Sequence, residues 1–127
     1  MFLTSLVSLI PESPPEMPPP PPIIAVVEFS ALDVWIQRLA QCESGGDELA
    51  LNPRDTDGTP SKGKFQFKDG TFNYFSQKYN IATTSIWSGA EQELILRRMI
   101  KDPEVDLRYQ FPACVRQLGL PESLVSE

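Results

Sequence analysis

Residues 31–46 read ALDVWIQRLAQCESGG, a stretch in which an apolar stripe ends in an acid. The stripe repeats at the spacing of one helix face and consists of Leu32, Trp35, Ile36, Leu39 and Glu43. A carboxyl group on such a face meets apolar side chains more than water, and this desolvation raises its pKa. The Ser-Gly-Gly that follows predicts that the helix ends directly after the acid.

Glu43 has two interpretations on this pattern. A carboxyl with a raised pKa at a helix end is suited to general acid catalysis. Alternatively, it is a solvated glutamate of the kind that often stands near a glycine at a helix end. The sequence that follows favours the first interpretation.

The composition describes one acidic globular domain. The chain has 127 residues, 41% of them hydrophobic, with 11 basic and 17 acidic residues and a formal net charge of -6. Apart from the first 28 or so residues, which look unlike the rest, the chain is long enough for one domain of about 100 residues. The basic residues are scattered, and their one cluster, Arg97, Arg98 and Lys101, suits the last turn of a helix. Because nucleic-acid-binding proteins usually present a basic stripe, we expect no nucleic-acid partner. For the oligomeric state we take a monomer as the default.

The residue types narrow the chemistry further. The chain contains no histidine, which excludes Ser–His and Cys–His nucleophilic pairs and removes the commonest zinc ligand. Carboxylates are therefore the main acid–base candidates, and we expect neither a metal nor a cofactor. Cys42 and Cys114 are too few for a structural zinc site and too far apart in sequence for a redox Cys-x-x-Cys pair. They form either a disulfide or two buried thiols.

The first part of the chain differs from the rest. Residues 1–22 hold eight of the thirteen prolines, which favours extended polyproline II over a packed core. Residues 1–10 are apolar but lack a basic flank and are too short to span a membrane. We therefore divide the chain into a disordered linker or export-segment remnant at residues 1–28 and a catalytic domain at residues 29–127.

A helix and a hairpin open the domain. Ser30 caps the first helix, with Asp33 three residues later in a near capping box. Residues 47–62 are rich in Asn, Asp, Pro, Gly, Thr and Ser, which is typical of turns, and residues 64–67 alternate like a short strand. Together they predict a loop or small hairpin beside Glu43.

Two longer helices follow the hairpin. The second helix begins at Asp69 or Thr71, because aromatic residues recur at helical spacing over residues 72–79. The third opens with a capping box at residues 88–91 and ends at Asp102-Pro103. We expect its inward-facing residues to include Leu94, Ile95 and Met99.

A short last helix is predicted for residues 112–119, with proline in its first turn and glycine as its C-cap. The fold class is therefore mostly α, a small α+β domain in which a short β-hairpin lies beside the helix that carries Glu43. A hairpin next to a glutamate at a helix end makes two walls of a groove.

Four groups of residues carry a resemblance to a known superfamily. They are CESGG at 42–46, GKFQF at 63–67 with Thr71-Phe72, AEQE at 90–93 and FPAC at 111–114. In this order and spacing they resemble the lysozyme-like superfamily, specifically lytic transglycosylases and resuscitation-promoting factors, over about residues 32–120. The resemblance implies a lysozyme-like fold and a disulfide between the cysteine beside the acid and the one near the C-terminus.

The resemblance also implies roles for single residues. Glu43 is the catalytic acid by this match, and Gln66 hydrogen-bonds the sugar chain or shapes the groove floor. Thr71 matches the family's threonine, and we add Ser61 and Tyr109 as candidate substrate-binding residues. Gln66 on the solvent face of a strand, and Tyr109 in ordinary packing, are the alternatives.

The implied reaction is cleavage of the β-1,4 bond between MurNAc and GlcNAc in peptidoglycan. A lytic transglycosylase needs one carboxyl, because the substrate's own C6 hydroxyl attacks and the product is a 1,6-anhydro sugar. A hydrolase needs a second carboxylate to position water or trap the cation, for which Asp55 and Asp57 are the candidates. The alternative for residues 55–58 is an ordinary turn. A calcium loop is disfavoured because the glutamate at its twelfth position is missing.

We expect a lytic transglycosylase, with a peptidoglycan hydrolase as the nearest rival. A non-catalytic wall-binding or virion module, or a protein-interaction module on a proline-rich arm, is a reading of a different class. The disulfide and the wall substrate imply a protein that is secreted, in the cell envelope or associated with a phage, with peptidoglycan strands as its partner.

Overall fold

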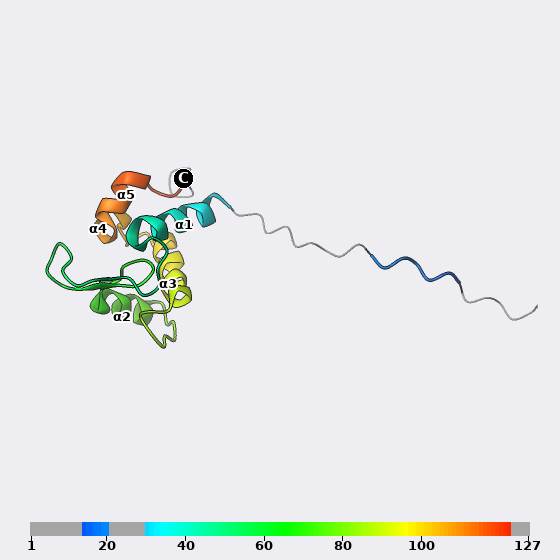
Figure 1. The fold of residues 1–127 in the computed structure, drawn as a ribbon, viewed down its shortest axis with the longest axis horizontal. Coiled ribbons are helices and arrows are strands. Elements are labelled where there is room, and N and C mark those ends of the chain that lie inside the picture. Colours follow the sequence, from blue (N-terminus) through cyan, green and yellow to red (C-terminus); the bar gives the residue numbers. More distant parts are fainter. Residues whose placement is uncertain (1–13, 21–29, 123–127) are drawn as a thin grey trace, which may run out of the picture.

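The computed structural model describes residues 14–20 and 30–122. Residues 14–20 are exposed and have no regular secondary structure, and the rest of the predicted segment 1–28 lies outside the described residues. Five helices and one two-stranded sheet make up the described domain (Figure 1). In chain order they are α1 (Ala31–Ser44), β1 (Leu51–Asn52), β2 (Ser61–Lys62), α2 (Asp69–Lys78), α3 (Gly89–Lys101), α4 (Leu107–Gln110) and α5 (Pro112–Leu118).

The first helix forms as predicted. Ser30 Oγ accepts a hydrogen bond from the Asp33 backbone N–H at 3.2 Å, and the Asp33 carboxylate accepts one from the Ser30 N–H at 3.1 Å, which is a complete capping box. Trp35, Ile36 and Leu39 are buried, so the apolar stripe does face the core. The helix ends at Gly45, whose φ of 67° lies in the left-handed region that glycine favours.

The predicted hairpin is present, but the prediction of a strand at residues 64–67 is wrong. The antiparallel pair joins Leu51 to Lys62 and Asn52 to Ser61, and residues 63–66 form a turn. Gln66 within that turn has a φ of 55°. The apolar alternation that resembled a strand arises because the turn drives Phe65 and Phe67 into the core, where they are 0% and 2% exposed.

Gln92, a buried side chain on α3, holds this turn in place. Its Oε1 accepts a hydrogen bond from the Phe65 backbone N–H at 2.8 Å, and its Nε2 donates to the Lys62 carbonyl at 2.9 Å. Gly63 is required where the turn crosses this amide, because a Cβ there would lie 2.6 Å from Gln92 Nε2. A buried amide with its donors and acceptor satisfied fixes the turn against α3.

The third helix corrects two details of the prediction. Ser88 accepts from the Glu91 N–H, but the Glu91 carboxylate bonds Thr84 rather than closing the capping box. Leu94 was expected to face inward and is 49% exposed. The buried arc of α3 is set by its other apolar and amide positions, which are Gln92, Ile95, Leu96, Met99 and Ile100.

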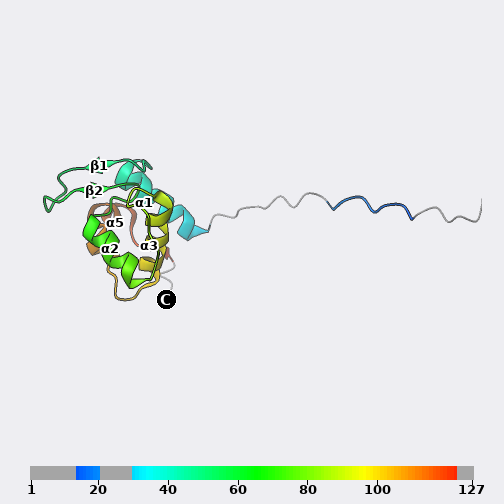
Figure 2. The ribbon, with the colours of Figure 1, turned by 90° about the horizontal axis from the view of Figure 1, so that it is seen from below.

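One hydrophobic core joins the helices and the turn. Its largest fully buried apolar side chains are Phe65, Ile36, Leu39, Ile95, Leu96 and Met99. Trp35 Nε1 donates to the carbonyl of Gly119 at 2.9 Å, so α1 is also bonded to the end of α5. Figure 2 shows the hairpin at one edge of the domain, next to α1. The structure is thus a small, mostly helical α+β domain with an antiparallel hairpin.

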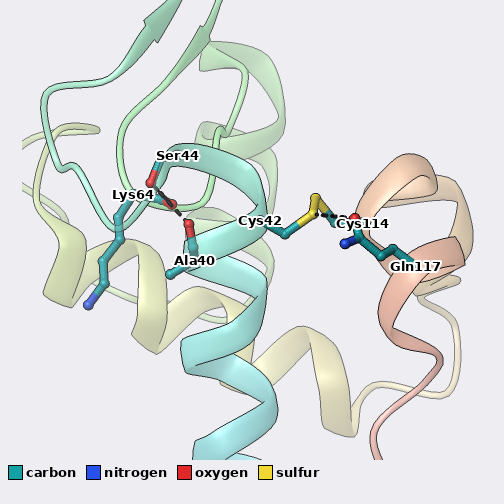
Figure 3. The surroundings of a disulfide bond; sticks show 6 residues. All are labelled: Ala40, Cys42, Ser44, Lys64, Cys114 and Gln117. Atoms are coloured by element: carbon teal, nitrogen blue, oxygen red, sulfur yellow. Dashed lines mark hydrogen bonds between the residues drawn. A yellow bond between two sulfur atoms is a disulfide. The ribbon is translucent and has the colours of Figure 1, made fainter.

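The two cysteines form a disulfide between α1 and α5. Cys42 and Cys114 are 72 residues apart in sequence, and their Cα atoms are 5.9 Å apart. Figure 3 shows the bond connecting the last turn of α1 to α5. The disulfide that the sequence resemblance implied is therefore confirmed.

We predict that reducing this bond costs about 4 kcal/mol of unfolding free energy, because a long loop is released in the unfolded chain. Denaturant unfolding with and without a reductant measures the loss. The double variant Cys42→Ala/Cys114→Ala is the control, since a reductant should not change its midpoint. A wild-type midpoint that stays fixed after thiol counting has confirmed full reduction would contradict the prediction.

Candidate active site

Glu43 lies in the last turn of α1, and both of its sequence neighbours are tied to other parts of the fold. Cys42 is bonded to α5 through the disulfide, and Ser44 Oγ donates to the carbonyl of Lys64 at 2.6 Å. Figure 3 shows Cys42 and Ser44 pointing to different sides of α1, one toward α5 and one toward the turn after β2. The backbone at Glu43 is therefore fixed relative to both.

The Glu43 side chain is half-buried and faces a groove of about 550 Å³. The other walls come from residues 55–57 of the hairpin loop, residues 66–68, Thr71 at the start of α2, and residues 108–113 of α4 and α5. A volume of this size is typical of a small-ligand site. The hairpin and the helices therefore enclose the groove that the sequence predicted beside the acid.

Burial, and to a lesser degree the nearby negative charge of Asp55, together raise the pKa of Glu43 to about 7. A glutamic acid in water has a pKa of 4.5. At neutral pH a large share of the molecules therefore carries a proton on Glu43. Such a group can donate a proton to a bound ligand and later take one back.

Asp55 is the second carboxylate of the groove, and its surroundings lower its pKa, whereas those of Glu43 raise the glutamate pKa. Ser61 Oγ donates to Asp55 Oδ2 at 2.5 Å, and the Thr56 backbone N–H donates to Oδ1 at 2.7 Å. The Lys68 ammonium lies 4.0 Å from Oδ2. These hydrogen bonds, and the lysine charge to a lesser degree, lower the pKa of Asp55 and keep it ionised.

Asp57 is more exposed and serves the loop. Its Oδ1 accepts hydrogen bonds from Lys68 Nζ and from both the Oγ1 and the backbone N–H of Thr59. The contact with Lys68 makes the largest contribution to a pKa held far below the usual aspartate value. Since its Oδ1 is already bonded to Lys68 and Thr59, Asp57 is less suited than Asp55 to act on a ligand.

Gln66 and Thr71 both line the groove. Gln66 Nε2 donates to the carbonyls of Ala50 and Gly63, at 3.1 and 2.9 Å, so its amide nitrogen holds the hairpin together. This leaves the amide oxygen as the part of Gln66 that is suited to bind a ligand. Thr71 is half-buried near the start of α2 and places a hydroxyl in the same wall.

The other two predicted binding residues lie in contrasting places. Ser61 is 0% exposed and its hydroxyl donates to Asp55, so Ser61 positions that carboxylate. Tyr109 on α4 is 79% exposed and lines the groove. Tyr109 is thus placed to contact a ligand directly, whereas Ser61 acts through its neighbour.

Two cations of the groove were missed by sequence reasoning. Lys68, the N-cap residue of α2, bridges Asp55 and Asp57, and Arg108 on α4 also lines the groove. Neither residue belongs to a motif, and no local pattern indicates that α4 approaches the hairpin loop. With Glu43 protonated, these two cations balance the charges of Asp55 and Asp57.

The described residues contain neither a cluster of metal ligands nor a helix suited to span a membrane. Residues 14–20 and 30–122 contain no group of three or more His, Cys, Asp or Glu side chains placed to hold a metal ion. Within the same ranges, no helix is long and apolar enough to cross a membrane.

Comparisons with known proteins give no family for the chain. No family model, no curated protein and no solved structure matches it. The residues of the groove and the sequence resemblance are therefore what bear on the function of the chain.

The raised pKa of Glu43 predicts a pH-dependent cost to stability. Its pKa is 4.5 in water and about 7 in the fold, so the folded state binds more protons between these values and loses stability as the pH rises through them. Glu43→Gln removes this cost. We expect the free energy of unfolding of the variant to exceed that of the wild type by about 1 to 3 kcal/mol at pH 8. At pH 4 we expect little of this difference.

Denaturant unfolding of both proteins at the two pH values measures the effect. Glu104→Gln is the matched control, because its carboxylate is 77% exposed and lies outside the groove. A stability difference between Glu43→Gln and wild type that is the same at both pH values would count against a desolvated acid.

Proposed function

We propose that the protein cleaves the β-1,4 bond between MurNAc and GlcNAc in peptidoglycan, with Glu43 as the general acid. The observation that carries this proposal is the half-buried Glu43 on the wall of a groove, where burial raises its pKa to about 7. An acid that keeps its proton near neutral pH is what a glycosidic oxygen needs when it leaves.

The reaction needs few other groups. Glu43 protonates the leaving oxygen while positive charge builds up on the sugar ring. In the lytic transglycosylase route, the C6 hydroxyl of the same sugar then attacks C1 and gives its proton to the Glu43 carboxylate. The products are a 1,6-anhydro sugar and a new chain end, and the acid is regenerated without water.

The fold is consistent with a lysozyme-like domain. A helix ends at the acid, a hairpin follows directly, and the remaining helices close the core behind them. The residues that carry the resemblance also meet in space, since Gln66 and Thr71 line the groove with Glu43, and Gln92 supports the turn that contains Gln66. We assign the chain to this superfamily as part of the proposal.

Asp55 favours hydrolysis as a second candidate. It lines the same groove as Glu43, stays ionised, and its charge is close enough to raise the Glu43 pKa. One protonated and one ionised carboxyl facing a sugar is the arrangement of a glycoside hydrolase. In this route Asp55 positions a water molecule or stabilises the cationic sugar.

The disulfide supports a location outside the cytoplasm. Such bonds persist mainly in oxidising compartments, and peptidoglycan lies in one. We therefore propose that the protein acts in the cell envelope, as a secreted enzyme or as part of a phage.

Incubation of purified protein with isolated peptidoglycan, followed by mass spectrometry of the soluble sugars, tests the proposal. We expect Glu43→Gln to lower the rate by about 10²- to 10⁴-fold, because the general acid is lost. Wild-type activity should fall as the pH rises through about 7, where Glu43 loses its proton. Glu104→Gln again serves as the control, with activity close to wild type.

The products separate the candidate reactions. Sugars one water lighter than reducing ends mark a transglycosylase, and reducing ends mark a hydrolase. Asp55→Asn should slow a hydrolase strongly. A transglycosylase should keep most of its maximal rate and lose activity at a lower pH than the wild type, because the charge that helps raise the Glu43 pKa is gone. Cleavage by Glu43→Gln at the wild-type rate would refute the role of the acid, and binding without cleavage by wild type would identify a non-catalytic wall-binding module.

A further inference from the structure

The hairpin loop, residues 53–60 between β1 and β2, forms one wall of the groove and has no hydrophobic anchor. Residues 55–57 of this loop line the groove with Glu43. Every residue of the loop is exposed apart from Asp55, which is half-buried. Inside the loop, the Asp55 N–H donates to the Thr59 carbonyl at 3.2 Å. A loop without buried apolar side chains keeps its place mainly through polar contacts with its neighbours.

Lys68 provides such contacts from the start of α2. Its ammonium bonds Asp57 Oδ1, donates to Thr59 Oγ1 at 2.8 Å and lies 4.0 Å from Asp55 Oδ2. Among the described residues, the other side chains that bond the loop from outside belong to the two strands that the loop joins. Lys68 is therefore the residue that links the hairpin loop to the helices.

The position of Lys68 is unfavourable for the helix that follows it. Lys68 is the N-cap residue of α2, and its side chain makes no capping hydrogen bond. Serine, threonine, aspartate and asparagine are preferred at this position because their oxygens accept from free N–H groups of the first turn. The helix dipole also disfavours a cation there. A residue that breaks a local rule of helix stability commonly has a role at a functional site.

We propose that Lys68 is a positioning residue, which holds the hairpin loop in place as a wall of the groove. The inference rests on the proposed function, because the ligand that needs this wall is the glycan strand bound beside Glu43. Without the ammonium, the carboxylates of Asp55 and Asp57 lose their shared counter-charge and repel each other. The loop is then free to move away from α2, and a ligand must order it again on binding.

Nitrogen-15 relaxation of the backbone at residues 55–59 tests this role without any substrate. We expect order parameters of about 0.85 in the wild type and below about 0.6 in Lys68→Met. Lys68→Arg keeps the positive charge and should restore the order of the loop. Lys62→Met is the matched control and should leave the loop ordered. Lys62 also joins the hairpin to α2, through an ion pair with Asp69 at 2.9 Å, but it does not line the groove.

A second variant separates positioning from a general loss of stability. Lys68→Ser removes the ammonium and supplies a side chain that can cap α2. Its unfolding midpoint should equal or exceed that of the wild type, although its loop should be as mobile as in Lys68→Met. A structural residue of the ordinary kind would lose loop order and stability together.

Cleavage rates measured against the concentration of soluble peptidoglycan strands connect the loop to the reaction. We expect Lys68→Met and Lys68→Ser to lower kcat/KM about tenfold, chiefly by raising KM, because ordering the loop weakens binding. Lys62→Met should stay near the wild type. Asp57→Asn should raise KM as well, and adding Lys68→Met to it should have little further effect, since both substitutions remove the same contact.

The outcomes distinguish this inference from the proposed function. Unchanged loop order in Lys68→Met, or an equal loss of order in Lys62→Met, would overturn the inference and leave cleavage by Glu43 intact. Fully additive effects of Lys68→Met and Asp57→Asn on KM would also overturn it, because Lys68 would then act on the ligand directly. A wild type that cleaves no strands would refute the proposed function and the role of the wall in glycan binding, whatever the order of the loop.

Discussion

The disulfide between Cys42 and Cys114 is the constraint on which the groove depends. It holds the last turn of α1 against α5, and the hydrogen bond from Ser44 to Lys64 holds the same turn against the hairpin. Glu43 stands between these two attachments, so its backbone is fixed relative to both α5 and the turn after β2. A helix end is normally the part that frays, and here it is bonded to both α5 and the turn after β2.

This fixed position has an energetic consequence. Water would lower the pKa of Glu43, but the fold keeps the side chain half-buried and places the Asp55 charge nearby. Ser61 and Lys68 stabilise that charge, so one carboxyl keeps its proton while the other loses it. Ionised Glu43 destabilises the folded domain, and the same burial gives an acid with a pKa near neutral pH. Sites of proton transfer commonly combine these two properties.

Local signals in the sequence accounted for much of the fold. The capping box at Ser30, the apolar stripe of α1 and the Pro112 start of α5 depend only on neighbouring residues, and the structure confirms them. The turn at residues 63–66 was misread because its conformation is set by Gln92, 26 or more residues away in sequence. The sequence likewise does not predict the burial of Ser61 or the bridge made by Lys68, because both depend on contacts across the loop.

Direct titration of the Glu43 carboxyl shows whether the fold keeps this acid protonated near neutral pH. Carbon-13 NMR of the labelled protein follows each glutamate side chain with pH, and the spectrum of Glu43→Gln assigns the missing signal. We expect a midpoint at about 7 for Glu43. A midpoint near 4.5, the value for a solvated glutamate, would contradict it and leave Glu43 as an ordinary residue at a helix end.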